Sequence, residues 1–316
     1  MKIQNALAIL AGIANVLVTT QAVGMGGSIT TIDPPHGIAF KDPVIMPNIS
    51  KIPGIVEVNL EAKVAPINVN GVTASLMTYN GTYPAPTIKV KKGDILKIHF
   101  KNSLPNSGVN MTGEARDLTN LHTHGLHVSP NGNSDNVMLN FMSGDAFDYE
   151  YDLSMHPGGN LNWYHPHISS TFPEQIWGGM AGALEVADET TALESYETHT
   201  MVLKDITLNG SVPTSYAMSD FMHGKEGDII MVNGQVNPVL NMRPGQIQRW
   251  KIVNASNGRF YKLSLVKHNL QVIGTDGGLL DKPYVQGSIV LAPGERIDIM
   301  VKASTTKGYY KLLSKP

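Results

Sequence analysis

The chain has 316 residues, enough for two ordinary domains that each bury a hydrophobic core. Its 24 Lys and Arg against 26 Asp and Glu give a formal net charge of −2, which argues against a nucleic-acid-binding protein because such proteins usually carry a basic excess. The sequence contains no cysteine, so this chain cannot build a disulfide, a thiolate metal site, a cysteine nucleophile or an iron–sulfur cluster.

The N-terminus has the pattern of an export signal. Lys2 precedes an apolar run from Ala6 to Val18, and small residues follow at Ala22 and Gly24. A membrane anchor would need roughly 20 apolar residues, and this run is shorter. We therefore expect residues 1–24 to be a signal peptide, the mature protein to be periplasmic or extracellular, and no membrane span to remain after cleavage.

The rest of the sequence predicts an all-β protein. Residues 25–50 are rich in Pro, Gly and Ile without periodicity and are expected to form an extended arm. From residue 55 onward, short β-type runs alternate with Gly, Pro and Asn turns, which is typical of sandwiches and barrels. The expected strands fall within residues 56–60, 87–100, 149–153, 183–186, 198–208, 229–233, 248–253, 261–273, 296–301 and 309–313.

An internal repeat indicates two domains of one type. Residues 86–102 can be laid over residues 238–254 so that the first proline, a glycine (Gly93 or Gly245) and a final asparagine (Asn102 or Asn254) coincide. Repeated segments of this kind usually mean one supersecondary unit used twice. With a boundary in the polar stretch 187–197, the sequence predicts two tandem sandwiches at residues 51–190 and 191–316.

The histidines carry the chemistry that the sequence predicts. His122 and His124 form one H-x-H pair, and His165 and His167 form another. In a strand, residues i and i+2 lie on one face, roughly 6.5–7 Å apart along the chain, so each pair would present two imidazoles side by side. If the strands converge, four imidazoles line one pocket, and imidazole without thiolate suits copper, zinc, iron or nickel.

The residues that flank the two histidine pairs narrow the choice of metal. The segments L-H-T-H-G at residues 121–125 and W-Y-H-P-H at 163–167 resemble the two N-terminal copper motifs of the multicopper oxidases. Further similarity lies at residues 134–136, 178–184, 243–246, 249–255, 274–278 and 291–296, so that the resemblance covers roughly residues 50–316. It implies tandem cupredoxin-like Greek-key β-sandwiches, in agreement with the strand pattern.

The resemblance also implies roles for individual residues. His122 would bind the type 2 copper, His124 and His165 would share one copper of the type 3 pair, and His167 would bind the other. Such a trinuclear cluster reduces dioxygen to water with electrons from a reducing substrate. Asp135 matches an acidic residue that helps to move protons or order water near the cluster, although the segment Ser-Asp-Asn is also good turn chemistry.

The sequence lacks other parts of the family's machinery. A type 1 copper needs a cysteine thiolate with two histidines, and the C-terminal H-x-x-H-x-H and H-C-H motifs that complete the cluster are not found. We therefore expect this chain to be the first two domains of a three-domain oxidase whose type 1 copper domain lies beyond this sequence. By itself it is not expected to oxidise laccase-type substrates, and the sequence does not identify the reducing substrate.

Two alternatives remain open. The chain could be a catalytically inactive copper-binding or structural protein of the cell envelope, because some relatives have lost their coppers. A zinc hydrolase is a weaker alternative, since no accompanying base motif is present. The other histidines are not expected to bind metal directly; they are His36, His99, His127, His156, His199, His223 and His268.

Overall fold

The repeat seen in the sequence forms the same unit twice in the computed structural model, which describes residues 14–20, 37–187 and 191–315. Strands β4 (Ala85–Val90) and β5 (Ile95–Asn102) correspond to β14 (Val239–Leu240) and β15 (Ile247–Asn254). Gly93 and Gly245 turn each pair at φ +85° and +74°, a backbone region that favours glycine.

The asparagine that ends each repeat has the same function in both copies. Asn102 donates from Nδ2 to the carbonyls of Asp117 and Phe141, and its Oδ1 accepts the N–H of a residue two positions later. Asn254 is also buried; it donates to two carbonyls and accepts the N–H two positions later. Each asparagine therefore closes a loop that leaves its strand.

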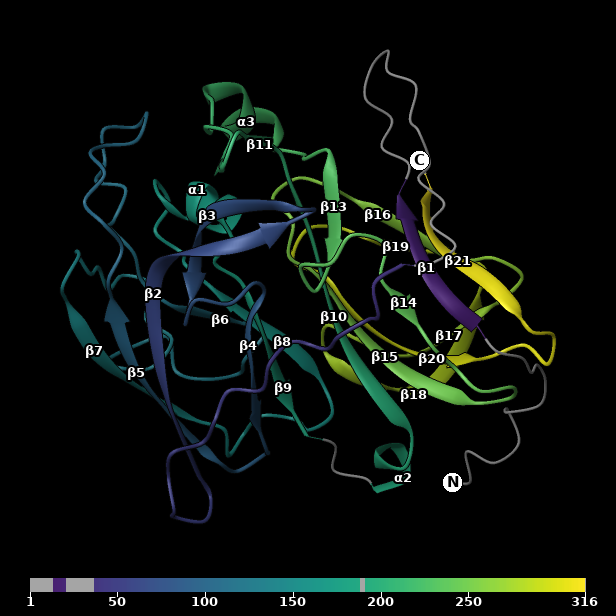
Figure 1. Ribbon diagram of the computed structural model, residues 1–316. Coiled ribbons are helices and arrows are strands. Elements are labelled where there is room, and N and C mark those ends of the chain that lie inside the picture. The colour runs from purple at the N-terminus through teal and green to yellow at the C-terminus, as the bar shows by residue number, and fades with distance from the viewer. Residues whose placement is uncertain (1–13, 21–36, 188–190, 316) are drawn as a thin grey trace.

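Two four-stranded sheets form from residues 55–186 (Figure 1). One has the order β3-β2-β5-β7, with β2 (Ile55–Val69), β3 (Val72–Tyr79) and β7 (Ala146–Asp152) beside β5. The other has the order β4-β9-β8-β6, with β6 (His122–His124), β8 (Leu161–His165) and β9 (Gly182–Val186) beside β4. Side chains of both sheets share one core, which includes Leu60, Ile98 and Leu184.

The remaining strands form the second half of the molecule. Its six-stranded sheet has the order β13-β10-β15-β20-β17-β18, and its five-stranded sheet the order β14-β1-β21-β16-β19. Trp250, Leu263 and Ile299 lie in the core between them. The strands not yet given are β1 (Ala14–Thr20), β10 (Glu197–Ile206), β11 (Leu208–Asn209), β12 (Val212–Pro213), β13 (Ile229–Val232), β16 (Tyr261–Leu265), β17 (Leu270–Thr275), β18 (Gly278–Gln286), β19 (Ile289–Leu291), β20 (Arg296–Lys302) and β21 (Gly308–Lys315).

Strand β1 belongs to the apolar run that the sequence predicts to be a signal peptide. It lies between β14 and β21, antiparallel to β14 and parallel to β21. The expected cleavage region at residues 22–24 lies outside the described residues. A leader cut there would take β1 with it.

The two halves are joined by apolar packing and by an N-terminal segment that runs across both. One small cluster at the junction includes Trp163 with Val253, and another includes Trp177 with Ile206. Residues 37–46, the described part of the expected arm, exchange backbone hydrogen bonds with Thr87 in the first half and Val239 in the second. The arm is therefore an ordered connector rather than a loose tail.

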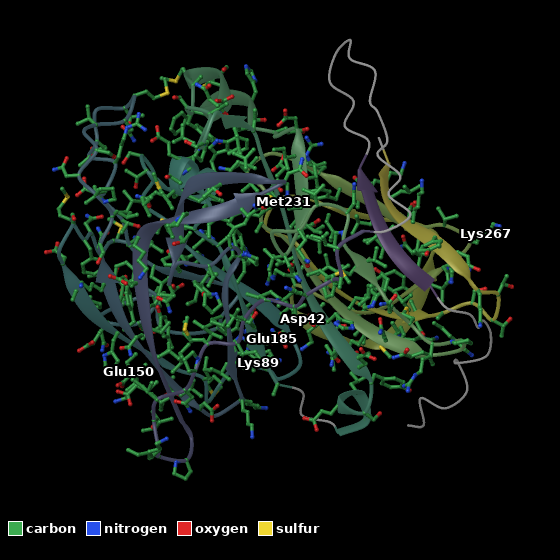
Figure 2. The ribbon with its side chains drawn as sticks, viewed as in Figure 1. Asp42, Lys89, Glu150, Glu185, Met231 and Lys267 are labelled. Carbon is green, nitrogen blue, oxygen red and sulfur yellow. The ribbon has the colours of Figure 1, made fainter. Side chains whose placement is uncertain are left out.

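Polar contacts fix the arm at the same junction (Figure 2). Asp42 accepts the backbone N–H of Thr200 at 2.8 Å, and the Thr200 hydroxyl bonds to Glu185 of β9. The arm, β9 and β10 thus share one hydrogen-bonded chain.

Helices are few and short in the described part of the chain. They are α1 (Phe172–Gly178), α2 (Thr191–Glu194) and α3 (Met218–His223). None of them has the length and apolar composition that crossing a membrane would require. The all-β fold class predicted from the sequence is confirmed.

Candidate metal centre

The two H-x-H segments meet on neighbouring antiparallel strands. In the pairing of β6 with β8, His122 lies directly opposite His165, and His124 lies opposite Trp163. Strand β8 is buried along its whole length because Tyr164 packs in the core of the first half and Trp163 packs with Val253 of the second. The register of one buried strand thus places three imidazoles at the same end of the sheet.

The strand geometry expected of both pairs holds only for the first. His122 and His124 are the first and last residues of β6, on one face. His165 is the last residue of β8, and Pro166 after it has no N–H to continue the ladder. His167 is placed instead by Asn120, whose Oδ1 accepts the His167 backbone N–H at 2.7 Å.

All four imidazoles nevertheless come together. The ring centroid of His122 lies 5.6 Å from that of His124, 5.2 Å from that of His165 and 4.8 Å from that of His167. Three of these residues, His122, His124 and His165, each offer one ring nitrogen, and these three nitrogen atoms lie within 4.8 Å of one another. Among the residues described, this is the group of histidine and acidic side chains close enough to hold a metal ion.

Hydrogen bonds determine which ring nitrogen faces the cluster. The Nδ1 of His122 lies 2.9 Å from Asp135 Oδ2, and the Nδ1 of His165 lies 2.7 Å from the carbonyl of Pro166. Both Nδ1 atoms therefore carry the proton, and Nε2 keeps the lone pair. The Nε2 of His165 faces Nδ1 of His124 at 3.3 Å, a separation at which two lone pairs need a shared proton or a cation between them.

Burial favours the neutral form of three of the four imidazoles. It lowers the pKa of His124 to about 4, with a further contribution from the nearby Arg296 guanidinium. It also lowers the pKa of His165 and His167. Because a metal ion binds the unprotonated ring, these imidazoles are ready to act as ligands at neutral pH.

Asp135 is held in place by two contacts. Besides His122, its Oδ1 accepts the backbone N–H of Thr123 at 2.8 Å. The carboxylate thus lies beside the first two residues of β6 and orients one imidazole of the cluster. The Asx turn of this segment is made by its neighbour Asn136, whose Oδ1 accepts the N–H of Met138 at 3.1 Å, and not by Asp135.

A cavity of about 510 Å³ lies beside the cluster, at the junction of the two halves. His124, His165 and His167 line it from the first half, and Asn257 and Gly294 line it from the second. Trp163 packs on the rings of His124 and His165, with centroids at 5.2 and 4.0 Å, and so separates them from the core. The copper-motif histidines therefore face open space on one side and aromatic packing on the other.

The other described histidines have different partners. His99 lies between Asp148 and Glu57, His199 bonds to Asp42, and His127 packs on His156 away from the cluster. His36 lies outside the described residues. Sequence reasoning did not find Asn120 or Arg296, because a buried asparagine before a strand and an arginine far along the chain carry no spacing signal.

Comparison with known proteins gives the same family over most of the chain. A model of the family described as multicopper oxidase matches residues 61–191, and a second with that description matches residues 183–315. The multicopper oxidase mco of Staphylococcus haemolyticus is 30% identical over 241 residues, 74% of this chain and 50% of that protein. The cell division protein FtsP of Proteus mirabilis is 32% identical over 71% of this chain and 46% of its own length.

Comparison with a solved structure supports the same family. The multicopper oxidase of Campylobacter jejuni, described as a metallo-oxidase, superposes with a TM-score of 0.74 at 26% identity, covering 89% of this chain and 62% of that one. The chain spans about half the length of the curated relatives named above. The matched family implies copper binding, and imidazole nitrogens converging in a neutral pocket suit that metal. The chain belongs to the multicopper oxidase family.

Proposed function

We propose that this chain carries the N-terminal half of the trinuclear copper site of a multicopper oxidase, which couples oxidation of a reducing substrate to reduction of dioxygen to water. The observation that supports this most directly is the convergence of four imidazoles from the two H-x-H segments, three of them on the opposed strands β6 and β8. The remaining ligands, and the cysteine of a type 1 copper, would have to come from polypeptide outside this sequence.

The proposed ligand roles follow the family motifs. His122 holds the type 2 copper, His124 and His165 share one type 3 copper, and His167 holds the other. His124 Nδ1 and His165 Nε2, 3.3 Å apart, are close enough for one copper ion to bind both in place of the proton of their hydrogen bond. Copper would supply one-electron redox chemistry and a binding site for dioxygen.

The protein's own contribution is orientation and protonation. Asp135 keeps the Nδ1 proton of His122 in place and so directs Nε2 of that ring into the cluster. The Pro166 carbonyl does the same for His165. With its carboxylate at the edge of the cluster, Asp135 is also placed to order water or pass a proton, which is the role that we propose for it.

Copper binding by defined histidines is the first test. The purified chain would be titrated with copper and with zinc, the retained metal counted by mass spectrometry, and Cu(II) followed by electron paramagnetic resonance. His165→Ala should lose copper, and His223→Ala, an exposed histidine on α3, should retain it. Equal copper retention by both variants would contradict the proposed site. Steady four-electron reduction of dioxygen by this chain alone would contradict the claim that it holds only part of the cluster.

A second candidate function is a catalytically inactive copper-binding or structural protein of the cell envelope. The similarity to FtsP, named a cell division protein, favours it. That alternative does not depend on whether the histidines bind copper. It predicts that supplying the missing oxidase segment from a relative would produce no oxygen consumption.

Two further expectations belong to the proposal. The chain divides into an extended arm at residues 25–50 and cupredoxin-like domains at residues 51–190 and 191–316. The protein is exported to the periplasm or outside the cell after removal of residues 1–24. N-terminal sequencing of protein recovered outside the cytoplasm would test the cleavage.

A further inference from the structure

A turn of the second half packs on His124. Residues 292–295 join β19 to β20, and a Cβ on Gly294 of this turn would lie 3.3 Å from Cε1 and 3.8 Å from Nε2 of the His124 ring. Trp163 covers the same imidazole, because its ring stacks on that of His124 at an interplanar angle of 30°. The Nδ1 of His124 faces His165. The second half therefore reaches the histidine cluster at this imidazole.

Arg296 fastens that turn to the first half. Its side chain is 6% exposed, Nη1 donates to the carbonyl of Gly294 at 3.2 Å, and Nε donates to the carbonyl of Leu161, the first residue of β8, at 3.1 Å. Asp276 balances the charge, since its Oδ1 lies 2.7 Å from Nη1. A Cβ on Gly125, next in sequence to a cluster histidine, would collide with Nη2. One closely packed guanidinium thus ties the turn that touches the cluster to a strand of the cluster.

The orientation of the His124 ring depends on this packing. The rings of His122 and His165 are each held by a hydrogen bond from Nδ1 to an oxygen of the first half. In the described part of the chain, the hydrogen bond of the His124 ring is the one to His165, itself a candidate ligand. Contacts with Trp163 and Gly294 therefore have to keep the His124 ring from turning.

We propose that Arg296 is a positioning residue for the candidate metal centre. It holds the Gly294 turn against His124, and the turn keeps Nδ1 of that ring directed at His165. The second half is then needed for the His124–His165 pair to bind an ion, although all four histidines come from the first half. The inference rests on the proposed function in taking His124 as a ligand, but the orientation of the ring can be measured without copper.

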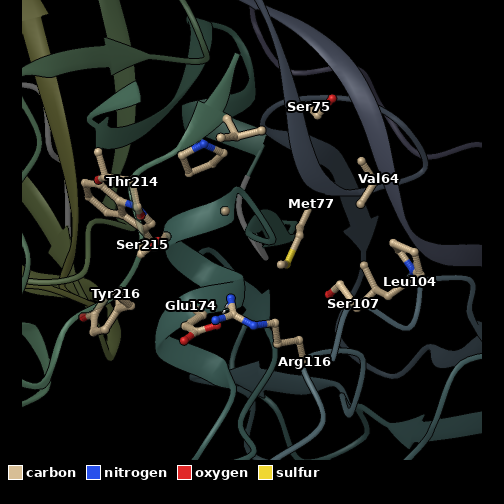
Figure 3. A pocket seen from close by; sticks show the side chains of 15 residues that line it. Val64, Ser75, Met77, Leu104, Ser107, Arg116, Glu174, Thr214, Ser215 and Tyr216 are labelled. Carbon is tan, nitrogen blue, oxygen red and sulfur yellow. Dashed lines mark hydrogen bonds and ion pairs between the residues drawn. The ribbon is translucent and has the colours of Figure 1, made fainter. Parts of the chain in front are cut away.

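A second arginine at the junction offers a matched control (Figure 3). Arg116 lines a separate pocket of about 280 Å³ between the two halves, where its Nη1 donates to Glu174 at 3.0 Å. Glu174 is 7% exposed on α1, and both residues belong to the first half. Arg116→Gln should destabilise the chain, because it leaves a buried carboxylate unpaired, without altering the contacts of His124.

Spectra of the metal-free chain test the proposal. With isotopic nitrogen in the histidines, long-range proton–nitrogen NMR reports which ring nitrogen of each imidazole carries the proton. His165 has its Nδ1 on a carbonyl, so His124 of the unmodified chain should hold its proton on Nδ1 and donate to His165 Nε2. Arg296→Gln and Arg296→Lys should both give a mixture of the two tautomers of His124, because neither side chain has the fixed fork of donors that arginine has. Arg116→Gln should leave the His124 signal unchanged.

Copper affinity, measured by competition with a chelator, gives a second readout. The two Arg296 variants should bind copper about 10–100-fold more weakly, the range for groups that orient a metal ligand, and Arg116→Gln should bind it normally. Asp276→Ala removes one contact of the guanidinium at a position 47% exposed, so it should fold and change both readouts less, in the same direction.

The inference fails if the His124 signal of Arg296→Gln matches that of the unmodified chain, or if Arg116→Gln alters that signal equally. An unmodified chain that binds no copper would instead refute the proposed function, and the spectra of the metal-free variants would still decide the role of Arg296.

Discussion

Glycine at position 182 is predicted to be required by the side chain opposite it. Gly182 begins β9 and pairs with Tyr164 of β8. A Cβ at this position would lie 2.3 Å from Cζ and 2.5 Å from Oη of Tyr164, well inside van der Waals contact. Tyr164 has nowhere to move, because it is fully buried and its hydroxyl donates to the carbonyl of Pro86 at 2.6 Å.

Gly182→Ala should therefore destabilise the protein far more than one methyl group suggests. Overpacking a core costs about 1–3 kcal/mol, and displacing Tyr164 would leave a buried hydroxyl and carbonyl unpaired for about 1–3 kcal/mol more. We expect a loss of roughly 2–6 kcal/mol in the free energy of unfolding. Since Tyr164 precedes His165 in the same strand, copper retention should fall as well.

Urea denaturation followed by tryptophan fluorescence measures this effect. With a slope of about 2 kcal/mol per molar urea, the midpoint should fall by about 1 M or more. Gly287→Ala is the control, because a Cβ there meets nothing within 4 Å. If both variants unfold at the same urea concentration as the unmodified chain, the packing of Tyr164 against Gly182 is not as described.

Three further predictions concern other parts of the fold. Asn254→Ala should cost about 2–4 kcal/mol by leaving buried backbone groups unpaired, and Asn102→Ala should cost a similar amount, measured by urea denaturation. Asp42→Ala should speed proteolysis and hydrogen exchange within residues 37–46, because the N–H of Thr200 loses its acceptor. Hydrogen bonds to Asp148 and a second carboxylate raise the pKa of His99, so the stability that this contact adds is complete below the unfolded pKa and is lost as pH rises through the folded pKa. His99→Gln should accordingly destabilise the protein near pH 5.5 and have little effect above pH 8, as measured by thermal unfolding across that range.

Much of the fold was predictable from local patterns. Each run expected to be a strand overlaps at least one strand of the structure, and the strand–glycine–strand repeat is found in both halves. The segment 261–273 shows the limit of such patterns. Expected to be one strand, it is broken into β16 and β17 by a turn in which Lys267 has a φ of +59°. Nothing in the sequence indicates that this lysine adopts a left-handed backbone conformation.

The sequence predicted the candidate metal ligands but not the residues that hold those ligands in place. Two H-x-H segments on strands indicate four imidazoles, because strand periodicity is a local property. The pairing of His122 with His165 depends on sheet register, and the position of His167 depends on a distant asparagine, Asn120. Contacts of that kind arise from tertiary packing, which a single sequence does not encode as a spacing.

The arm across the two halves has a consequence for the order of assembly. Gln235 donates to the carbonyl of Ala39 across a separation of 196 residues. In a chain that emerges N-terminus first at roughly 5–20 residues per second, the arm waits about 10–40 s for that partner. During this interval residues 37–46 can pair with Thr87 of the first half but not with the second. Residues of the second half thus fix in place a segment that was made much earlier, and a chaperone that shields the arm would act within this interval.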